Sequence, residues 1–221
     1  ANSANSRPTL LYAYGGFEIS IRPWYNATVG KSWLERGGTY VLANIRGGGE
    51  FGPTWHQSAL KTNRNKAYED FIAVAEDLVN RGITKPRHLG IKGGSNGGLL
   101  TGVAFTHRPD LFNAVVCQVP LLDMKRYTKL LAGHSWIAEY GDPEQPEIWK
   151  FWKNWSPYHN VIKATNSPTV LFTTSTKDDR VHPGHARKMV ARMKAQGHSV
   201  LYYENMEGGH AGAANLKQRA Y

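Results

Sequence analysis

The sequence predicts an α/β fold with a mostly parallel central sheet. Short apolar runs, typical of buried strands, alternate with runs of helical periodicity along the chain. This alternation is typical of parallel sheets that carry helices on their faces. The 221 residues suit one domain, and the 41% that are hydrophobic are enough for a core.

The expected strands are short apolar segments bounded by glycine, proline or polar residues. They lie at 8–14, at the start of 38–52, and at 87–93, 112–120, 167–175 and 199–206.

Three helices are expected between these strands. The segment 67–82 places its apolar residues at helical spacing and ends at Gly82, a residue that favours helix C-termini. The apolar run Leu99–Phe105 predicts a buried helix, and 185–197 predicts another. Residues 121–166 interrupt the alternation and are rich in Trp, Tyr and Pro. We expect them to form a helical insertion over one end of the sheet, where active-site walls are often built.

The composition argues against several classes of protein. The formal net charge is +10, but the basic residues are scattered, and Lys61, Arg64 and Lys66 are expected on a solvated loop, so we expect no nucleic-acid partner. No apolar run is long enough for a membrane helix, and no signal peptide is visible. We therefore expect no membrane association, and a location in the cytoplasm or the periplasm. The single cysteine, Cys117, is expected to be a buried, inert thiol.

One glycine-rich segment carries a candidate nucleophile. Residues 93–97, GGSNG, match the G-x-S-x-G pattern and lie between an expected strand and an expected helix. In a nucleophile elbow, glycines on both sides allow a sharp turn that exposes the serine, here Ser95. A phosphate-binding P-loop is excluded because no G-K-[ST] follows. The pattern G-x-G-x-x-G at 47–52 is followed by Pro53 and by no ribose-binding acid, which indicates a tight loop rather than a dinucleotide site.

A serine hydroxyl needs a base and an orienting carboxylate to become a nucleophile. In α/β-hydrolases the order along the chain is serine, acid and histidine, each after a strand. The strand at 167–175 leads to Asp178 and Asp179, and the strand at 199–206 leads to His210. His210 is therefore the candidate base. Spacing alone does not separate the two aspartates.

These motifs together resemble the catalytic domain of the prolyl oligopeptidase family of serine peptidases. The resemblance rests on GGSNGG, STKDDRVHP and EGGHAG, extends through YAYGGF, NIRGGGEFG and GHSWIAEYGDP, and covers nearly the whole chain from Pro8. In having an asparagine directly after the serine, the sequence resembles the prolyl endopeptidase branch of this family. The fold implied is an α/β-hydrolase.

The resemblance implies roles for further residues. It makes Asp178 the acid of the triad, and it pairs the hydroxyl of Tyr14 with the backbone N–H of Asn96 in an oxyanion hole. It also implies that Trp136 stacks on a substrate proline, and that Arg180 binds a substrate carbonyl. Further walls of the same pocket are implied at three positions: Phe17, Tyr140 and Val181.

The expected function is hydrolysis of short peptides after proline through an acyl-enzyme, with no metal or cofactor. Three alternatives stay open: an oligopeptidase B-like or broadly specific peptidase, an esterase, and a non-catalytic interaction domain. Glu139, Asp142 and Glu144 are the acids near the implied pocket that could receive a basic substrate.

The resemblance also sets expectations about the extent of the domain. The catalytic domain is expected at 8–221, with residues 1–7 as a linker or as residues added to the natural protein. The family implies a β-propeller over the active site, and nothing in this sequence can form one. We expect an α/β-hydrolase fold truncated at both ends, because the family's first antiparallel strands and last long helix find no counterpart.

Overall fold

The computed structural model describes residues 6–163 and 166–212, and its centre is a parallel sheet. Six strands form it in the order β2-β1-β3-β4-β5-β6, and every neighbouring pair is parallel. Their bounds are Thr9–Tyr12 (β1), Thr39–Leu42 (β2), Leu89–Gly94 (β3), Ala114–Gln118 (β4), Thr169–Ser175 (β5) and Val200–Asn205 (β6). Five of them lie within the segments expected from the sequence, and β3 extends one residue beyond its segment, to Gly94, so the predicted α/β fold is confirmed.

The longer helices also match the expected segments. They are Asn65–Asn80 (α3), Asn96–His107 (α4) and Gly184–Ala195 (α8). Arg81 caps α3, and Gly82 follows with φ +70°, the left-handed conformation that glycine adopts without strain. Helix α4 is the central one, because all its residues from Asn96 to Phe105 are buried.

The remaining elements are short. Between β1 and β3 lie Ala27–Val29 (α1), a π-helical turn at Gly30–Leu34 (η2), Pro53–Gln57 (α2), and 3-10 turns at Lys61–Asn63 (η3) and Pro86–His88 (η4). A further 3-10 turn, Pro109–Leu111 (η5), precedes β4. The expected insertion is helical and contains Tyr127–Lys129 (η6), Leu131–Trp136 (η7), Ile137–Tyr140 (α5), Pro146–Trp155 (α6) and Pro157–Asn160 (α7).

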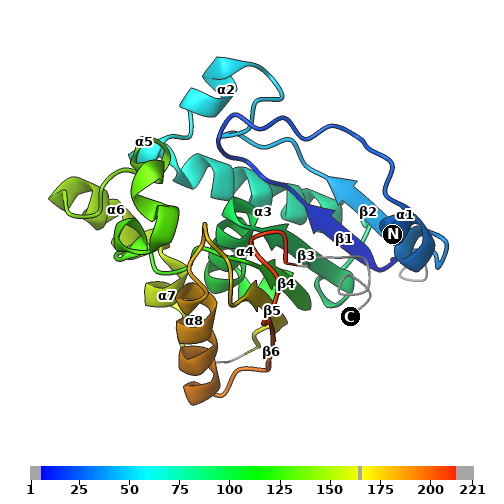
Figure 1. Cartoon of the computed structure of the whole chain (residues 1–221). Helices are drawn as coiled ribbons and strands as arrows, with labels where there is room; N and C mark the ends of the chain where they lie inside the picture. Colours follow the sequence, from blue (N-terminus) through cyan, green and yellow to red (C-terminus); the bar gives the residue numbers. More distant parts are fainter. Residues whose placement is uncertain (1–5, 164–165, 213–221) are drawn as a thin grey trace.

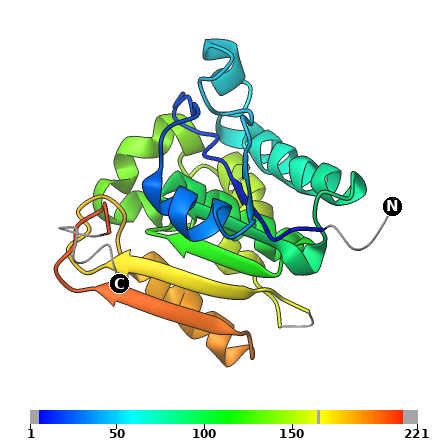
Figure 2. The same cartoon turned by 90° about the vertical axis from the view of Figure 1, so that its right-hand side faces the viewer.

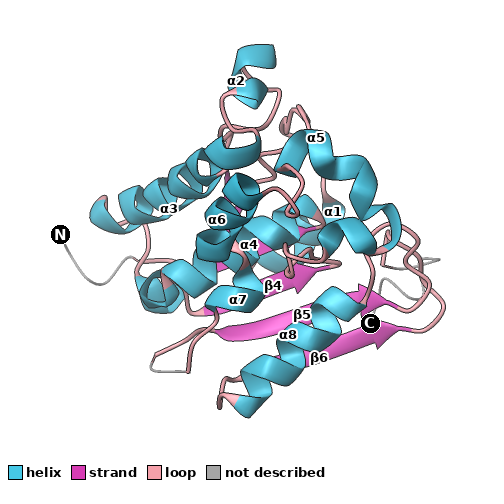
Figure 3. Cartoon of the chain, turned by 90° about the vertical axis from the view of Figure 1, so that its left-hand side faces the viewer, coloured by secondary structure: helices cyan, strands magenta, loops and turns pink. Residues whose placement is uncertain are grey.

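The helices divide unequally between the two faces of the sheet (Figures 1, 2 and 3). In the described part of the chain, α3, α4, α7 and α8 lie on one face, whereas α1 and η2 lie on the other. Burial alternates along β1 and β3, and the fully buried strand side chains include Leu11, Ile91 and Phe172. On edge strand β6, Leu201 and Tyr203 are 57% and 48% exposed.

The ends of the strands decide where a site can form. Figure 2 shows the arrowheads of β5 and β6 pointing to the side that carries the loops after each strand, and the helical insertion lies on that side too. Parallel strands bring their carboxyl ends to one edge of the sheet. The loops that follow β1, β3, β5 and β6 therefore converge there.

The predicted linker at residues 1–7 concerns mostly residues outside the described part of the chain. Ser6 lies within it, and its Oγ lies 2.9 Å from Nδ1 of His88. The carbonyl of Arg7 accepts hydrogen bonds from Thr9 and Thr84. These two residues therefore pack against the domain.

Candidate active site

Ser95 lies in a strained turn between β3 and α4. Its φ of 57° and ψ of −117° are unfavourable for a residue with a side chain. The glycines around it have a steric cause. A Cβ on Gly93 would lie 2.1 Å from the carbonyl oxygen of Gly97, and a Cβ on Gly98 would lie 2.7 Å from Cβ of Pro120. The chain can make this turn only with glycine at those positions.

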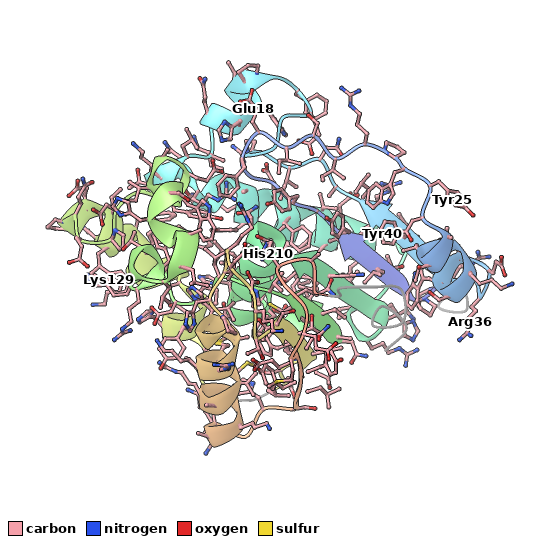
Figure 4. The ribbon with its side chains drawn as sticks, in the orientation of Figure 1. Glu18, Tyr25, Arg36, Tyr40, Lys129 and His210 are labelled. Carbon is pink, nitrogen blue, oxygen red and sulfur yellow. The ribbon has the colours of Figure 1, made fainter. Side chains whose placement is uncertain are left out.

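His210 joins Ser95 to Asp178 by two hydrogen bonds. Its Nδ1 lies 2.8 Å from Oδ2 of Asp178, and its Nε2 lies 3.2 Å from Oγ of Ser95. An ionised carboxylate only accepts, so Nδ1 carries the proton and Nε2 is free to accept from the serine hydroxyl. Figure 4 labels His210 near the middle of the view. Three loops, after β3, β5 and β6, supply the three side chains.

Asp178, not Asp179, makes this contact. The Asp178 side chain is fully buried, and its Oδ1 accepts hydrogen bonds of 2.9 Å from the backbone N–H groups of Arg180 and Val181. Burial raises the pKa of Asp178, but the hydrogen bonds from His210 and from the two N–H groups outweigh it and leave the pKa below its usual value. Asp179 is exposed. The structure thus separates two residues that spacing could not.

Tyr14 and Asn96 lie beside the serine. Tyr14 follows β1, and burial raises the pKa of its phenol above the usual value, although a hydrogen bond with the Ser95 side chain and the charge of Arg64 lower it in part. The phenol therefore keeps its proton and can donate it in a hydrogen bond. Asn96 is the first residue of α4, so its N–H has no acceptor one helical turn earlier. The Asn96 Nδ2 donates to the carbonyl of Tyr14 at 2.7 Å.

A small cavity opens next to Ser95. Its volume is about 160 Å³, below the range of about 300–1,000 Å³ that is usual for drug-sized ligands, so it suits a single side chain. Its lining consists of Tyr14, Phe17, Ile19, Ser95, Leu121, Trp136, Tyr140 and Arg180.

Most of the expected pocket residues lie around this cavity. Trp136 and Tyr140 are buried in its wall, with exposed fractions of 8% and 0%. The rings of Phe17 and Tyr140 meet edge to face at 5.5 Å. Arg180 is exposed at the rim. Val181 differs from the expectation: it does not line this cavity, because it is 2% exposed and turned inward, with its N–H bound to Asp178.

The sequence did not reveal a buried ion pair behind the site. Arg64 was expected on a solvated loop, yet its side chain is 1% exposed, so that expectation was wrong. Its Nη1 donates to Oε1 of Glu139 at 2.8 Å, and its Nη2 donates to Oδ1 of Asn96 at 2.6 Å. Glu139 also lies 2.7 Å from Nε2 of His56. Its carboxylate is therefore engaged by internal partners and does not face the cavity.

The other two acids near the pocket are also engaged elsewhere. Oδ1 of Asp142 accepts the backbone N–H of Glu144 at 3.0 Å, and the Glu144 carboxylate pairs with Lys129 at 3.2 Å. Within the described ranges, no group of three or more His, Cys, Asp or Glu side chains is arranged to hold a metal ion. No helix in these ranges is long and apolar enough to span a membrane.

Comparison with known proteins identifies the family of the chain. Residues 25–221 match the family model described as the prolyl oligopeptidase family. The chain belongs to the prolyl oligopeptidase family. Among curated members, an uncharacterised peptidase of Sinorhizobium fredii is 60% identical over 97% of this chain, and the prolyl endopeptidase of Elizabethkingia miricola is 40% identical over 96%.

Solved structures of prolyl oligopeptidase family members superpose closely on the chain. A post-proline cleaving enzyme from Rickettsia typhi has a TM-score of 0.94 and 48% identity over 100% of this chain. The chain spans 30% of each of the two curated relatives and 32% of that structure. The shared part is therefore less than a third of each of these longer proteins.

Proposed function

We propose that this chain is the catalytic part of a serine peptidase that cleaves peptide bonds on the carboxyl side of proline. The observation that carries the proposal is the continuous hydrogen-bonded relay from Asp178 through His210 to Ser95. The placement of these groups after the parallel strands β3, β5 and β6 matches the order used by α/β-hydrolases.

In the first half of the reaction, the Oγ of Ser95 attacks the carbonyl carbon of the substrate. The serine proton passes to Nε2 of His210, and Asp178 stabilises the imidazolium through Nδ1–H. The carbonyl oxygen becomes an oxyanion, which accepts hydrogen bonds from the hydroxyl of Tyr14 and the N–H of Asn96. One such donor stabilises the transition state by about 3–4 kcal/mol. The C–N bond then breaks, and the leaving amine takes the proton from His210.

In the second half, water replaces the amine. His210 accepts a proton from the water, whose oxygen attacks the acyl carbon of the ester on Ser95. The same two donors hold the second oxyanion. When the C–O bond to Ser95 breaks, the serine recovers its proton from His210 and the peptide acid leaves.

The cavity beside Ser95 supports a preference for proline. A proline ring is compact and apolar and carries no donor, so it suits an aromatic wall such as Trp136. The volume of about 160 Å³ fits one compact ring and disfavours long side chains. The exposed guanidinium of Arg180 at the rim is suited to a backbone carbonyl of the substrate.

The charge of the cavity disfavours a preference for basic residues. Among the described residues that line it, Arg180 carries the only permanent charge, and this charge is positive. Glu139, which directly precedes the lining residue Tyr140, is bound to Arg64 and His56. A broadly specific peptidase and an esterase use the same triad, so substrate comparison must separate them. A non-catalytic interaction domain would not need the strained turn at Ser95.

We make two wider proposals, and the family membership supports the first. A longer protein that contains this domain carries a β-propeller over the site and accepts short proline-containing peptides. Its compartment is the cytoplasm or the periplasm. The first proposal rests on resemblance, and neither rests on the geometry of this chain.

Hydrolysis of a blocked Gly-Pro chromogenic amide tests the function. The natural full-length protein is assayed on this substrate, on the matching Gly-Arg amide, and on a Gly-Pro ester, with Ser95→Ala as the control. We expect serine-dependent cleavage of the proline amide and ester, and at least tenfold slower cleavage of the arginine amide. Cleavage of the ester alone would indicate an esterase, and cleavage of none would indicate an interaction domain.

A further inference from the structure

Arg64 is a buried cation behind Ser95, and it takes no part in the hydrogen bonds that join Asp178, His210 and Ser95. Its guanidinium has polar partners at both terminal nitrogens and lies 5.5 Å from the ring centroid of Tyr140 and 5.9 Å from that of Tyr68. Burying a charge is unfavourable unless it is paired, and an apolar residue would serve the core as well. A requirement other than core packing therefore explains this cation better.

One end of the guanidinium holds Asn96. Nη2 of Arg64 donates to Oδ1 of Asn96 at 2.6 Å, and the hydroxyl of Tyr140 donates to the same oxygen at 2.8 Å. With Oδ1 fixed by two donors, Nδ2 of Asn96 is directed to the carbonyl of Tyr14. The side chain of Asn96 thus ties together the two residues that supply the oxyanion donors.

The other end holds the wall of the cavity. Nη1 of Arg64 binds Oε1 of Glu139, and the same oxygen accepts the backbone N–H of Phe17 at 2.9 Å. Phe17 and the next residue, Glu18, both have φ of 56°, a strained backbone that needs external support. His56 on α2 binds the second oxygen of Glu139 and lies 3.8 Å from Glu18. Figure 4 shows Glu18 beside α2.

The space around these groups allows little movement. A Cβ on Gly16 would lie 2.5 Å from Nδ2 of Asn96 and 2.7 Å from Nη2 of Arg64. A Cβ on Gly47 would lie 2.4 Å from the carbonyl oxygen of Gly15 and 3.0 Å from Nη1 of Arg64. The backbone after β1 therefore packs directly on the guanidinium, which fixes the position of the Tyr14 segment.

We propose that Arg64, paired with Glu139, is the positioning residue of the oxyanion hole and sets the distance between its donors and the wall formed by Phe17. The proposal rests on the proposed function, because the oxyanion forms only during acyl transfer. Arg64 contacts no reacting atom. Its effect passes through Asn96 on one side and through Glu139 on the other, and it needs the planar fork of arginine to reach both.

Three variants of the natural full-length protein test this proposal. Arg64→Met removes the fork and the charge at similar length, Arg64→Lys keeps the charge without the fork, and Arg64→Met/Glu139→Gln also removes the carboxylate left without its partner. Arg108→Met is the matched control, because Arg108 is also ion-paired, with Glu76 and Asp110, but lies outside the site. Thermal unfolding of each variant shows which of them are folded at the assay temperature.

Two ligands distinguish positioning from a general structural role. A blocked glycyl-prolinal forms a hemiacetal with Ser95 and places an oxyanion in the hole. A blocked alanyl-pyrrolidide fills the proline cavity but has no carbonyl at the reacting position. Only the affinity for the prolinal depends on the geometry of the oxyanion-hole donors.

In Arg64→Met we expect kcat on the Gly-Pro amide to fall by about 10²-fold, with KM changed less than threefold. The affinity for the prolinal should fall by the same factor as kcat/KM, and that for the pyrrolidide by less than threefold. Arg64→Lys should recover part of kcat, because it keeps the charge but reaches one partner only. The double variant should stay as slow as Arg64→Met, and Arg108→Met should match the wild type.

Equal losses for the two ligands, or a wild-type kcat in a folded Arg64 variant, would overturn the proposal. If Arg64→Met fails to fold, the affinities of Arg64→Lys and of the double variant for the two ligands provide the same comparison. A wild-type protein that does not cleave the Gly-Pro amide would instead overturn the proposed function, and this inference with it.

Discussion

Two hydrogen-bonded acid–base pairs meet at the junction of β3 and α4, and they differ in what they can do. Asp178 and His210 are joined at 2.8 Å, and the His210 side chain is 22% exposed. Glu139 and Arg64 are joined at the same distance, but their side chains are 5% and 1% exposed. The first pair reaches Ser95, whereas the second reaches Asn96, the next residue.

The difference shows that one short turn is served by a pair that can react and by a second pair that holds its neighbours in place. Histidine can accept a proton and return it, so the first pair can serve as a base and an acid. Arginine stays protonated in proteins, so the buried pair cannot pass a proton and can only hold its neighbours. Loss of the first pair should therefore abolish turnover, and loss of the second should misplace groups and destabilise the fold.

The largest expected effect concerns the acid of the first pair. In Asp178→Asn, the amide can donate to Nδ1 of His210, which favours the wrong tautomer of the imidazole. We expect kcat on the Gly-Pro amide to fall by about 10⁴-fold. Asp179→Asn, the exposed neighbour, is the matched control and should change kcat less than threefold. A large loss in Asp179→Asn, or a small loss in Asp178→Asn, would reverse the assignment of the acid.

The second prediction concerns stability. Removal of one partner from a buried ion pair costs about 3–5 kcal/mol, whereas replacing both by apolar residues is often neutral. Arg64→Met should therefore lower the free energy of unfolding by about 3–5 kcal/mol, and Arg64→Met/Glu139→Met should recover most of it. His210→Gln should cost only about 1 kcal/mol, because Asp178 keeps its two backbone donors. Urea denaturation measures all three, and equal costs for the two pairs would remove the distinction between them.

The third prediction separates the cavity from the ion pair next to it. Trp136 directly precedes α5, which carries Glu139 and Tyr140. Trp136→Ala should lower kcat/KM on the Gly-Pro amide by about 10- to 100-fold, because it removes apolar contact with the ring. On a Gly-Ala amide the loss should be less than threefold, and activity on the proline ester should fall less than on the amide. Equal losses on the proline and alanine amides would indicate that the variant disturbs Glu139 instead.

The smallest effect is expected at a pair outside the junction. Arg187 on α8 pairs with Glu204 on β6. The hydrogen bond from Arg187 is the largest cause that lowers the pKa of Glu204, which falls from the ordinary 4.5 to about 2. A carboxyl whose pKa is lower in the folded protein than in the unfolded chain stabilises the fold at pH values above the unfolded-state pKa. This contribution is lost as the pH falls through the folded-state pKa.

Glu204→Gln should therefore lower the free energy of unfolding by about 1 kcal/mol at pH 7, because Arg187 is half-exposed and water screens the pair. The difference from the wild type should stay constant above about pH 5, shrink below 4.5 and vanish near 2. Urea midpoints across pH measure it. A difference that grows as pH falls would contradict the sign of this linkage.

The sequence predicted the parts of the site that have a local steric cause. The turn at Ser95 requires glycine at Gly93 and Gly98, so its pattern is visible in one short segment. His210 could be found because its loop follows a strand that the apolar pattern predicts. Asp178 could be separated from Asp179 only by resemblance, since burial against Arg180 and Val181 depends on how the loop folds back.

The burial of Arg64 could not be predicted from its surroundings. The segment around it, TNRNK, has the composition of an exposed loop. Its partners Asn96 and Glu139 lie 32 and 75 positions away along the chain, so no local pattern records the contact. The inward direction of Val181 has a local cause instead, because its N–H binds Asp178, three residues earlier in the same loop. Sequence patterns thus report local backbone requirements better than they report long-range polar pairing.

Trapping of the acyl-enzyme tests the central claim most directly. The natural full-length protein is mixed with the p-nitrophenyl ester of a blocked Gly-Pro acid, quenched in acid within one turnover, digested and weighed by mass spectrometry. We predict that the peptide containing Ser95 gains the mass of the blocked Gly-Pro acyl group, and that Ser95→Ala gains none. An adduct on another residue, or turnover without any adduct, would contradict the account.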